Sequence, residues 1–238
     1  MHRFFADRTA DGHAVLSAEE AAHALRVLRM QPGDPCQAIA DGRLFDARLE
    51  SAGSPAMLRL LCELPSPEPS VRVTLFQGLP KGDKMDWIAQ KCTEAGVSCI
   101  VPVLFSRCVT KWEKKDTEKK LPRWRRIAAE AAKQSGRAVI PEIGEPVSVK
   151  ALCEALPRYA LSLVPWEEEK TRGIRAHLMG QREISLIIGP EGGISPEEIA
   201  LLSAAGARAV TLGPRILRTE TAGLAALISL LTLTGDME

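Results

Sequence analysis

Short apolar runs separated by loops and amphipathic stretches follow one another from residue 71 to the end of the chain. Aliphatic and β-branched residues dominate five of these runs, at 71–78, 99–105, 159–164, 184–188 and 209–212. Apolar residues at helical spacing follow two of them, at 84–95 and 121–135. Strands that alternate with helices in this way are typical of a parallel sheet with helices on both faces. The pattern therefore predicts an α/β domain.

The first 64 residues have a different texture, in which short apolar runs alternate with Gly, Pro and Asp turns. Asp41-Gly42 lies between two such runs and predicts a tight β-hairpin. One helix is expected at 17–29, with Ser17 as its N-cap and Glu20 completing a capping box. These features predict a small β-rich barrel with one helix.

The segment Pro65-Ser-Pro-Glu-Pro-Ser70 separates the two textures. Proline-rich segments favour stiff, extended conformations and make good linkers. A chain of 238 residues is long enough for two domains with cores of their own. The sequence therefore predicts domains at 1–68 and 69–238.

The last two apolar runs each end in a glycine-bearing loop that opens a helix. The first glycine loop reads Gly-Pro-Glu-Gly-Gly at 189–193, and the second reads Gly-Pro-Arg-Ile-Leu-Arg-Thr-Glu-Thr at 213–221. Glycine lets a backbone approach a ligand closely, and in an open α/β sheet ligands bind at loops that leave the carboxyl ends of strands. We therefore expect both loops to face one pocket. The alternative is a pair of tight strand-to-helix turns that bind nothing.

Individual side chains in and after these loops indicate their roles. Ser195 and Glu198 predict a capped helix after the first glycine loop. In the second, Ile216 and Leu217 are suited to the apolar floor of a pocket for a flat ring. Thr219 is placed to cap the helix that follows.

The helix after the second glycine loop is apolar nearly all round, at Leu224, Leu227, Ile228, Leu230 and Leu231. A helix of this kind must be buried. Its partner is either the core of the monomer or a second copy of the chain. Arg218 and Glu220, just before it, are either part of the site or only a surface ion pair.

Charge is unevenly distributed, although the whole chain carries only +1. Residues 1–80 hold 8 basic and 10 acidic side chains, 81–137 hold 14 and 7, and 138–238 hold 9 and 13, which gives −2, +7 and −4. A basic middle segment favours a polyanionic partner. The basic run 111–126 also contains Trp112 and Trp124, whose indoles are able to stack on bases. The alternative is a solvated helix face.

Several classes of function are disfavoured by what the sequence lacks. It has no recognisable nucleophilic triad and no catalytic carboxylate pair. Its six cysteines and four histidines show no metal-ligand spacing, so we expect reduced thiols and no metal. The amino terminus lacks the apolar core of a signal peptide, and the longest apolar run, 222–233, is too short to span a bilayer. These features predict a soluble, cytoplasmic protein.

Short segments along nearly the whole chain carry a family resemblance. Two contain the glycine loops, Ile188-Gly-Pro-Glu-Gly-Gly-Ile-Ser195 and Leu212-Gly-Pro-Arg-Ile-Leu-Arg-Thr-Glu-Thr-Ala222. The others are His23-Ala-Leu-Arg-Val-Leu-Arg29 with Gly33-Asp34, Lys81-Gly-Asp-Lys-Met-Asp86, Lys91-Cys-Thr-Glu-Ala-Gly-Val97 and Glu130-Ala-Ala-Lys-Gln-Ser-Gly-Arg137. In this order and spacing they resemble the RsmE family of the SPOUT-class methyltransferases.

The resemblance implies a PUA-like β-barrel at 1–68 that binds RNA. It implies a SPOUT-type α/β domain at 69–238 with a deep C-terminal trefoil knot, which binds S-adenosylmethionine and forms the homodimer. The implied reaction is methylation of N3 of a uridine in 16S ribosomal RNA of the small subunit. N3 lies on the pairing edge, so the base must be unpaired or extruded.

By the motif match, three loops hold S-adenosylmethionine: the loop after 159–164, the loop at 189–193 and the loop at 212–219. The candidate cofactor-binding residues are Leu163, Gly189, Pro190, Glu191, Gly192, Leu212, Gly213, Ile216, Leu217, Arg218 and Thr219. For catalysis we expect Arg218 to stabilise an anionic uracil ring, while Glu191 or Glu220 accepts the N3 proton or anchors its loop. The candidate RNA-binding residues are His23, Arg26, Arg29, Lys81, Lys84, Arg107, Gln134 and Arg137.

Other interpretations stay open. One is a non-catalytic RNA-binding factor of ribosome assembly on the same fold, although the intact glycine loops favour an enzyme. Another is a methyltransferase of the same class that acts on a different nucleotide of ribosomal or transfer RNA. A nucleotide-hydrolysing or dehydrogenase enzyme is disfavoured, because the fingerprints G-x-G-x-x-G and G-x-x-x-x-G-K-[ST] are both absent.

Overall fold

The computed structural model describes residues 1–9, 11–109 and 112–237. The chain divides into two compact units. The first comprises Met1–Glu68 with Lys133–Val139, and the second comprises Pro69–Ala132 with Ile140–Glu238. Lys111, the first residue of the predicted RNA-facing run, lies outside the described residues.

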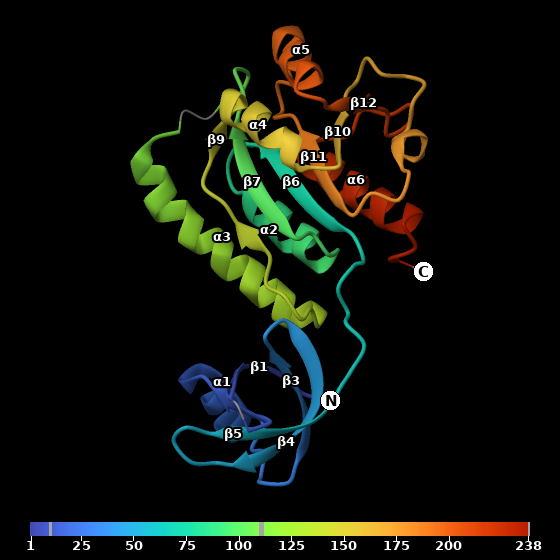
Figure 1. The fold of residues 1–238 in the computed structure, drawn as a ribbon. Helices are drawn as coiled ribbons and strands as arrows, with labels where there is room; N and C mark the ends of the chain where they lie inside the picture. The colour runs from blue at the N-terminus through green and yellow to red at the C-terminus, as the bar shows by residue number, and fades with distance from the viewer. Residues whose placement is uncertain (10, 110–111, 238) are drawn as a thin grey trace. The chain divides into compact units, whose positions relative to one another are not determined.

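The first unit is built on a closed barrel of five strands (Figure 1). These are β1 (Arg3–Arg8), β2 (His13–Leu16), β3 (Pro35–Ala40), β4 (Arg43–Ser51) and β5 (Met57–Glu63). Their order is β1-β2-β5-β4-β3, and a parallel pairing of β1 with β3 closes the ring of otherwise antiparallel pairs. Phe4, Leu49 and Leu58 are buried in its core. The predicted PUA-like barrel is confirmed.

The predicted hairpin forms between β3 and β4. Asp41 and Gly42 have φ angles of 53° and 71°. Positive φ at both central residues gives a two-residue turn whose twist matches that of the flanking strands. The Asp-Gly pair therefore fixes the register of β3 against β4.

The predicted helix at 17–29 forms in two pieces, α1 (Ala18–Ala22) and the π-helical η1 (His23–Val27). The Ser17 hydroxyl accepts the backbone N–H of Glu20 at 3.2 Å, so Ser17 is the N-cap as predicted. The Glu20 carboxylate pairs with Lys133 at 2.6 Å instead of closing a capping box.

The second unit is built on a sheet in which every strand pair is parallel (Figure 1). Its strands are β6 (Arg72–Gly78), β7 (Cys99–Leu104), β8 (Glu142–Ile143), β9 (Val147–Ser148), β10 (Leu161–Pro165), β11 (Glu183–Ile188) and β12 (Arg208–Val210). Their order is β12-β10-β11-β6-β7-β8, with β9 also paired to β7. The five predicted runs all form strands, whereas β8 and β9 were not predicted. Because neighbouring strands are parallel, the loops after β10, β11 and β12 leave from the same edge.

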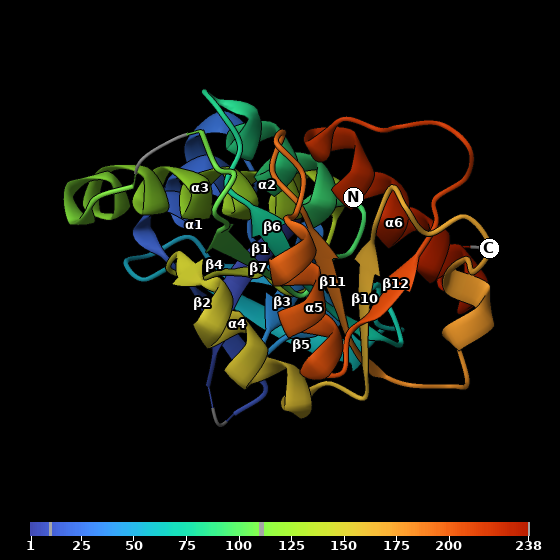
Figure 2. The same ribbon diagram turned by 90° about the horizontal axis from the view of Figure 1, so that it is seen from above.

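Helices cover both faces of this sheet (Figure 2). On one face lie α2 (Lys84–Glu94), α3 (Lys114–Ser135) and α6 (Thr219–Leu233), and on the other lie α4 (Val149–Ala155) and α5 (Pro196–Ala204). Short 3₁₀ turns occur at η2 (Leu156–Arg158) and η3 (Ile174–His177). Along β11, Leu186 and Ile188 join the core under α2, α3 and α6, while Ile187 joins the core under α4 and α5. The α/β prediction is confirmed.

The basic helix α3 begins at Lys114, about two turns before the predicted start at residue 121. Trp124 is only 3% exposed, and Trp112 stacks on it with ring centroids 5.6 Å apart. The Lys120 ammonium lies 5.0 Å from the centre of the Trp112 ring. The prediction that these indoles stack on bases is wrong for Trp124, which is enclosed, and Trp112 is already engaged by Trp124 and Lys120.

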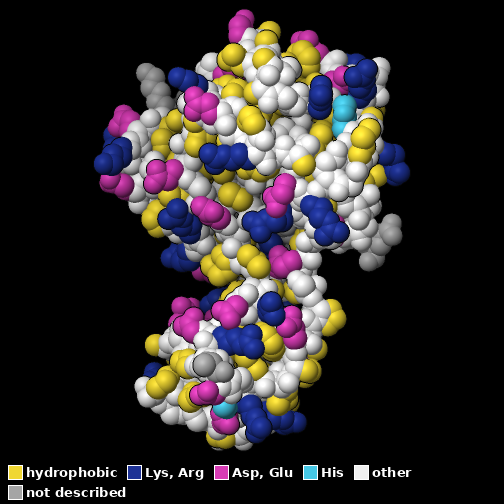
Figure 3. Space-filling model, in the orientation of Figure 1, with side chains coloured by type: hydrophobic (Ala, Val, Ile, Leu, Met, Phe, Trp, Pro, Cys, Tyr) yellow, Lys and Arg dark blue, Asp and Glu magenta, His cyan; other side chains and the backbone are white. Residues whose placement is uncertain are grey.

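Acidic side chains accompany many of the basic ones on and just before α3. Lys115 pairs with Glu113 at 2.8 Å, and Arg126 approaches Glu130 to 3.8 Å. Figure 3 shows Lys and Arg interspersed with Asp and Glu over the face that it presents. This mixture of signs favours the solvated-face alternative for α3 over a continuous phosphate-binding surface.

Several apolar side chains of α6 are buried within the monomer. Ala226, Leu227, Leu230 and Leu231 are 0% exposed and pack in the core of the second unit. Ile228 on the same helix is 37% exposed. The monomer therefore accounts for one side of α6 and leaves an apolar side chain on the other.

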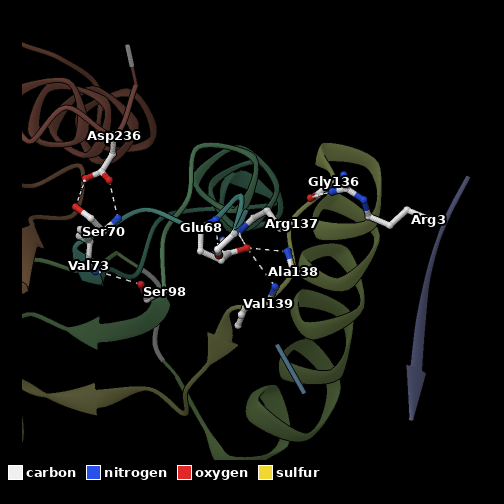
Figure 4. Close-up of polar contacts among 11 residues, drawn as sticks. Arg3, Glu68, Ser70, Val73, Ser98, Gly136, Arg137, Ala138, Val139 and Asp236 are labelled. Carbon is white, nitrogen blue, oxygen red and sulfur yellow. Dashed lines mark hydrogen bonds and ion pairs between the residues drawn. The ribbon is translucent and has the colours of Figure 1, made fainter. Parts of the chain in front are cut away.

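Arg137 belongs to the first unit and is buried, with 5% exposure. Its guanidinium donates to the Glu68 carboxylate, with a shortest N–O distance of 2.5 Å (Figure 4). The same carboxylate accepts the backbone N–H groups of Ala138 and Val139. A guanidinium enclosed and paired in this way does not reach a solvent-side ligand, so the prediction that Arg137 binds RNA is wrong.

None of the helices in the described part of the chain has both the length and the apolar character of a membrane span. All six cysteines are free thiols. Burial raises the pKa of Cys36 to about 11 and that of Cys92 to about 12. Thiols that stay protonated at neutral pH are poor nucleophiles, which favours a packing role for these two cysteines.

Candidate functional site

The loops after β10, β11 and β12 line one pocket at the carboxyl edge of the sheet. Its main part has a volume of about 610 Å³ and is also bounded by Lys84 of α2. A side part of about 110 Å³ lies between the loops after β10 and β12. Both parts share the lining residues Pro165, Glu167, Ile216, Leu217 and Ala222. The prediction that the two glycine loops face one pocket is confirmed.

The first glycine loop is packed closely against its neighbours. A Cβ on Gly78, the last residue of β6, would lie 2.4 Å from the backbone nitrogen of Pro190. A Cβ on Gly192 would lie 2.7 Å from the carbonyl oxygen of Arg107. Both distances are too short for any side chain, so only glycine permits these backbone approaches.

A buried chain of hydrogen bonds connects β6, α6 and the first glycine loop. Gln77 Nε2 donates to Thr219 Oγ1 at 2.8 Å, and Thr219 Oγ1 donates to the carbonyl oxygen of Gly189 at 2.6 Å. Gln77 is 0% exposed and Thr219 is 6% exposed. The prediction that Thr219 caps α6 is wrong, because Arg218 is the N-cap and Thr219 is the first helical residue. The Thr219 hydroxyl holds the first glycine loop instead.

Lys84 joins two carboxylates at the rim of the pocket. Its Nζ lies 3.0 Å from Glu191 Oε1 in the first glycine loop and 3.0 Å from Glu220 Oε2 in the first turn of α6. The side chains of Lys84, Glu191 and Glu220 are 30%, 23% and 19% exposed, so water screens their attraction only in part. The backbone N–H of Lys81 also donates to Glu191 Oε1, at 3.1 Å.

This arrangement keeps all three groups charged at neutral pH. Hydrogen bonds to Glu191 and Glu220 raise the pKa of Lys84. Burial by itself raises the pKa of each glutamate, but hydrogen bonds from Lys84 and from backbone N–H groups outweigh it and leave each pKa below its ordinary value. A carboxylate with a lowered pKa is a weak proton acceptor.

The second glycine loop is open to solvent. A Cβ on Gly213 would meet no heavy atom within 4 Å, although the φ of 102° disfavours other residues there. Ile216 is 77% exposed, and Arg218 is exposed as well. Among the described residues, no hydrogen bond or ion pair involves the Arg218 side chain. This loop therefore presents side chains that are available to a ligand.

The predicted capping box after the first glycine loop is confirmed. Ser195 Oγ accepts the backbone N–H of Glu198 at 3.2 Å, and Glu198 Oε2 accepts that of Ser195 at 3.1 Å. The other oxygen of Glu198 accepts the backbone N–H of Ser106 at 2.7 Å, which holds the segment after β7 next to this loop. Arg107 in that segment is exposed and donates to the carbonyl oxygen of Gly192 at 3.4 Å.

Nearly all predicted cofactor-binding residues line the pocket, namely Gly189, Pro190, Glu191, Gly192, Leu212, Gly213, Ile216, Leu217, Arg218 and Thr219. Leu163 does not, because it is 0% exposed in the middle of β10 and packs in the core. The pocket begins two residues later, at Pro165. The prediction for Leu163 is wrong.

The predicted RNA-binding residues occur in both units. His23, Arg26, Arg29 and Gln134 are exposed in the first unit. Lys81 and Arg107 are exposed in the second unit, beside the first glycine loop. Lys84 differs from these residues because it is enclosed between Glu191 and Glu220.

Several residues of the site were not predicted individually, although the loop after 159–164 was. Pro165 and Glu167 line the pocket, and a Cβ on Gly193 would lie 3.3 Å from a carboxylate oxygen of Glu167. The rule that ligand loops follow the carboxyl ends of strands applies to β10 and points to them. Gln77 and Gly78 at the end of β6 were also missed, although a glutamine inside an apolar strand is itself a signal. In the described part of the chain, no group of three or more His, Cys, Asp or Glu side chains is arranged to hold a metal.

Comparisons with known proteins match most of the chain. A family model for RNA methyltransferase domains matches residues 66–231. A protein of Mycobacterium bovis named Ribosomal RNA small subunit methyltransferase E is 36% identical over 228 residues, which are 93% of this chain and 87% of that protein. A protein of the same name from Bacillus subtilis is 35% identical over 222 residues, with coverages of 89% and 87%.

Solved structures give a similar result. A Ribosomal RNA small subunit methyltransferase E from Neisseria gonorrhoeae, crystallised with S-adenosyl methionine, is 32% identical with a TM-score of 0.81. The alignment covers 98% of this chain and 98% of that one. The likeness therefore extends over both units.

Proposed function

This chain belongs to the ribosomal RNA small subunit methyltransferase E family, and we propose that it methylates N3 of a uridine in 16S ribosomal RNA. It is an RNA methyltransferase whose cofactor is S-adenosylmethionine. The observation that carries the proposal is the pocket in which the loops after β10, β11 and β12 come together. The match to this family also supports our proposal that residues 69–238 are threaded into a trefoil knot.

The residues around the pocket fit S-adenosylmethionine. When bound, this cofactor supplies a methyl group on a positively charged sulfur. The exposed Ile216 and the half-buried Leu217 give an apolar surface for the adenine ring, and they line both parts of the pocket. Gly193, at which a Cβ would lie 3.3 Å from the pocket-lining Glu167, leaves the backbone of the first glycine loop bare toward the pocket. Glu167, on the loop after β10, offers a carboxylate to the hydroxyl or amino groups of the ligand.

We assign the stabilisation of the reacting base to Arg218. Uridine N3 must lose its proton, and a cation next to the ring favours the anionic form. The Arg218 side chain lines the main part of the pocket and is exposed at the N-terminus of α6. Because no described residue forms an ion pair with it, its guanidinium is available to the base.

Glu220 was a candidate proton acceptor, and its contacts favour the alternative role of an anchor. Its carboxylate pairs with Lys84, and its pKa lies below the ordinary value. Glu191 is in the same position. We therefore propose that both carboxylates hold their segments in place while the N3 proton leaves to solvent or to the RNA.

Exposed cations in each unit are proposed to hold the RNA. Phosphate contacts position a nucleic acid without reading its sequence. Lys81 and Arg107 lie beside the first glycine loop of the second unit. His23, Arg26 and Arg29 of the barrel unit are exposed and offer a second group, which supports a role in RNA binding for residues 1–68.

We also propose that the protein works as a homodimer in the cytoplasm. Ile228 of α6 is 37% exposed, and Trp87 of the neighbouring α2 is 38% exposed. A second copy would bury these apolar side chains. Light scattering of Ile228→Lys against the unmodified protein tests the dimer, and we expect a shift to the monomer mass.

Mass spectrometry of ribosomal RNA from cells with and without the gene tests the reaction. We expect one uridine of 16S ribosomal RNA to lose a methyl group on N3 when the gene is deleted. Loss of a methyl group at another nucleotide would support the same chemistry on a different substrate. Calorimetry that finds no binding of S-adenosylmethionine would support a non-catalytic assembly factor.

The role of Arg218 is tested by methylation of small subunits with tritiated cofactor. Arg218→Ala should bind S-adenosylmethionine and transfer at least about a hundredfold less label, because a preorganised charge partner is typically worth this much. Full activity of the variant would remove Arg218 from the mechanism.

A further inference from the structure

Lys84 stands outside the three loops that hold the cofactor, yet it contacts two segments of the pocket. It is the first residue of α2, the helix that follows β6. Its ammonium reaches the first glycine loop through Glu191 and α6 through Glu220, each at 3.0 Å. Three elements that are distant in sequence thus meet at one nitrogen atom.

We propose that Lys84 is a positioning residue for cofactor binding, whose ammonium fixes the first glycine loop relative to the first turn of α6. The proposal rests on the proposed function only in taking S-adenosylmethionine as the ligand of this pocket. It replaces the earlier expectation that Lys84 binds RNA. An ammonium that contacts two carboxylates keeps one of its three N–H donors, and the three groups together carry a net negative charge, which disfavours a phosphate.

The charge of Lys84 is what keeps these two segments together. The Glu191 and Glu220 oxygens that it contacts are at most 6.0 Å apart, since each lies 3.0 Å from the same nitrogen. Two ionised carboxylates at that distance repel each other when no cation lies between them. Removal of the ammonium would therefore drive the loop and the helix apart at the rim of the pocket.

A second connection between the same segments is neutral and lies deeper. Gln77 and Thr219 join β6 and α6 to the carbonyl of Gly189 within the buried interior. This connection does not depend on Lys84. A variant at Lys84 should therefore keep its fold and lose only the fixed geometry at the rim.

The decisive comparison is between Lys84→Met and Lys91→Met. Lys91 lies on the same helix and pairs with Glu94 at 2.8 Å, with side-chain exposures of 35% and 28% that resemble those around Lys84. That pair stays within α2 and touches no pocket segment. The Lys91 variant therefore controls for the loss of one half-buried ion pair from this helix.

Calorimetric titration of each variant with S-adenosylmethionine, without RNA, gives the first readout. We expect Lys84→Met to raise Kd about ten- to a hundredfold, the range of a coupling between contacting groups, and Lys91→Met to leave it unchanged. Lys84→Arg keeps the positive charge and should recover most of the affinity. In methylation assays, Lys84→Met should raise the KM for the cofactor more than it lowers kcat.

Hydrogen exchange of the proteins without ligand gives the second readout. Backbone amides at 191–194 and 220–222 should exchange faster in Lys84→Met than in the unmodified protein and in Lys91→Met. Unchanged affinity and unchanged exchange in Lys84→Met would overturn the proposal, as would equal effects of the two variants. This exchange result does not depend on which nucleotide is methylated. A failure of the proposed reaction would instead appear in the mass spectrometry of ribosomal RNA.

Discussion

The two glycine loops look alike in sequence and differ in how the fold treats them. The first is enclosed: β6 approaches it at Gly78, the Thr219 hydroxyl holds its Gly189 carbonyl, and Lys84 holds its Glu191. The second is open, with free space around Gly213 and with Ile216 77% exposed. Both begin with Gly-Pro at the end of a strand.

This difference indicates a division of labour within one pocket. A loop that is fixed by its neighbours offers preorganised backbone groups, so little ordering is needed when a ligand binds. A loop with exposed side chains offers apolar surface and charge that a ligand can cover. The first glycine loop therefore determines the geometry of the site, and the second supplies much of the contact through Ile216 and Arg218.

The largest effect is expected when the enclosure of the first loop is broken at Gly78. In Gly78→Ala the new Cβ would overlap the backbone at Pro190, and overpacking of this kind costs about 3 kcal/mol. The matched change Gly213→Ala meets no neighbour and should cost about 1 kcal/mol, from its backbone angle alone. Urea unfolding of the two variants measures the difference, and equal costs would contradict the contrast between the loops.

The next effect is expected at the hydroxyl that holds the first loop. Thr219→Val keeps the shape of the side chain but removes the partner of the Gly189 carbonyl and of one N–H of the Gln77 amide, which costs about 2 kcal/mol. Thr221→Val, on the same helix turn but exposed, is the control and should change the free energy of unfolding by less than about 0.5 kcal/mol. Affinity for S-adenosylmethionine should fall only in the first variant.

Local spacing made much of this fold predictable. Asp41-Gly42 encodes its turn in two residues, and Ser195 with Glu198 encodes a helix start in four. The apolar runs encode the strands because a strand buried on both faces needs aliphatic residues at successive positions. Each of these signals involves neighbours in the chain, and each was confirmed.

Contacts between distant residues were not predictable in the same way. Gln77 and Thr219 are 142 residues apart, and no pattern in either segment points to the other. Lys84 and Arg137 look like surface cations in the sequence, whereas the fold places a carboxylate beside each. Leu163 was misplaced for a different reason: it came from the family resemblance, although it lies inside the predicted strand 159–164 and, in the structure, in the middle of β10.

A smaller effect, confined to the rim of the first loop, is expected from pH. Glu191 and Glu220 have a lowered pKa in the folded protein, so their contribution to stability is present above the ordinary pKa of 4.5 and is lost as pH falls through the folded values. The raised pKa of Lys84 keeps its contribution up to alkaline pH. Between about pH 5.5 and 8 the contribution of these three charges to the free energy of unfolding of the unmodified protein should therefore not change with pH.

Without Lys84 the pKa of Glu191 and that of Glu220 should both rise, because each carboxylate loses its hydrogen bond to the ammonium. Burial, the largest influence on both carboxylates, is then opposed only by backbone N–H groups and, at Glu220, by the nearby cation Arg218. A raised pKa means that protonation stabilises the folded state as pH falls. The difference in free energy of unfolding between Lys84→Met and the unmodified protein should shrink from pH 7.5 to pH 5.5, by less than about 1 kcal/mol. A difference that grows over this range would show that Lys84 does not hold these carboxylates.

The smallest effect on stability is expected in the open loop, at Ile216. Because its side chain is 77% exposed, Ile216→Ser should change the free energy of unfolding by less than about 0.5 kcal/mol. If the ring of the cofactor covers this side chain, the same change should weaken binding of S-adenosylmethionine about tenfold, from the apolar area that is no longer buried. Leu201→Ser on α5 is the control, since Leu201 is 56% exposed and does not line the pocket. Equal affinities for S-adenosylmethionine in the two variants would mean that the Ile216 side chain does not contact the cofactor. The two glycine loops would then differ only in how tightly they are packed.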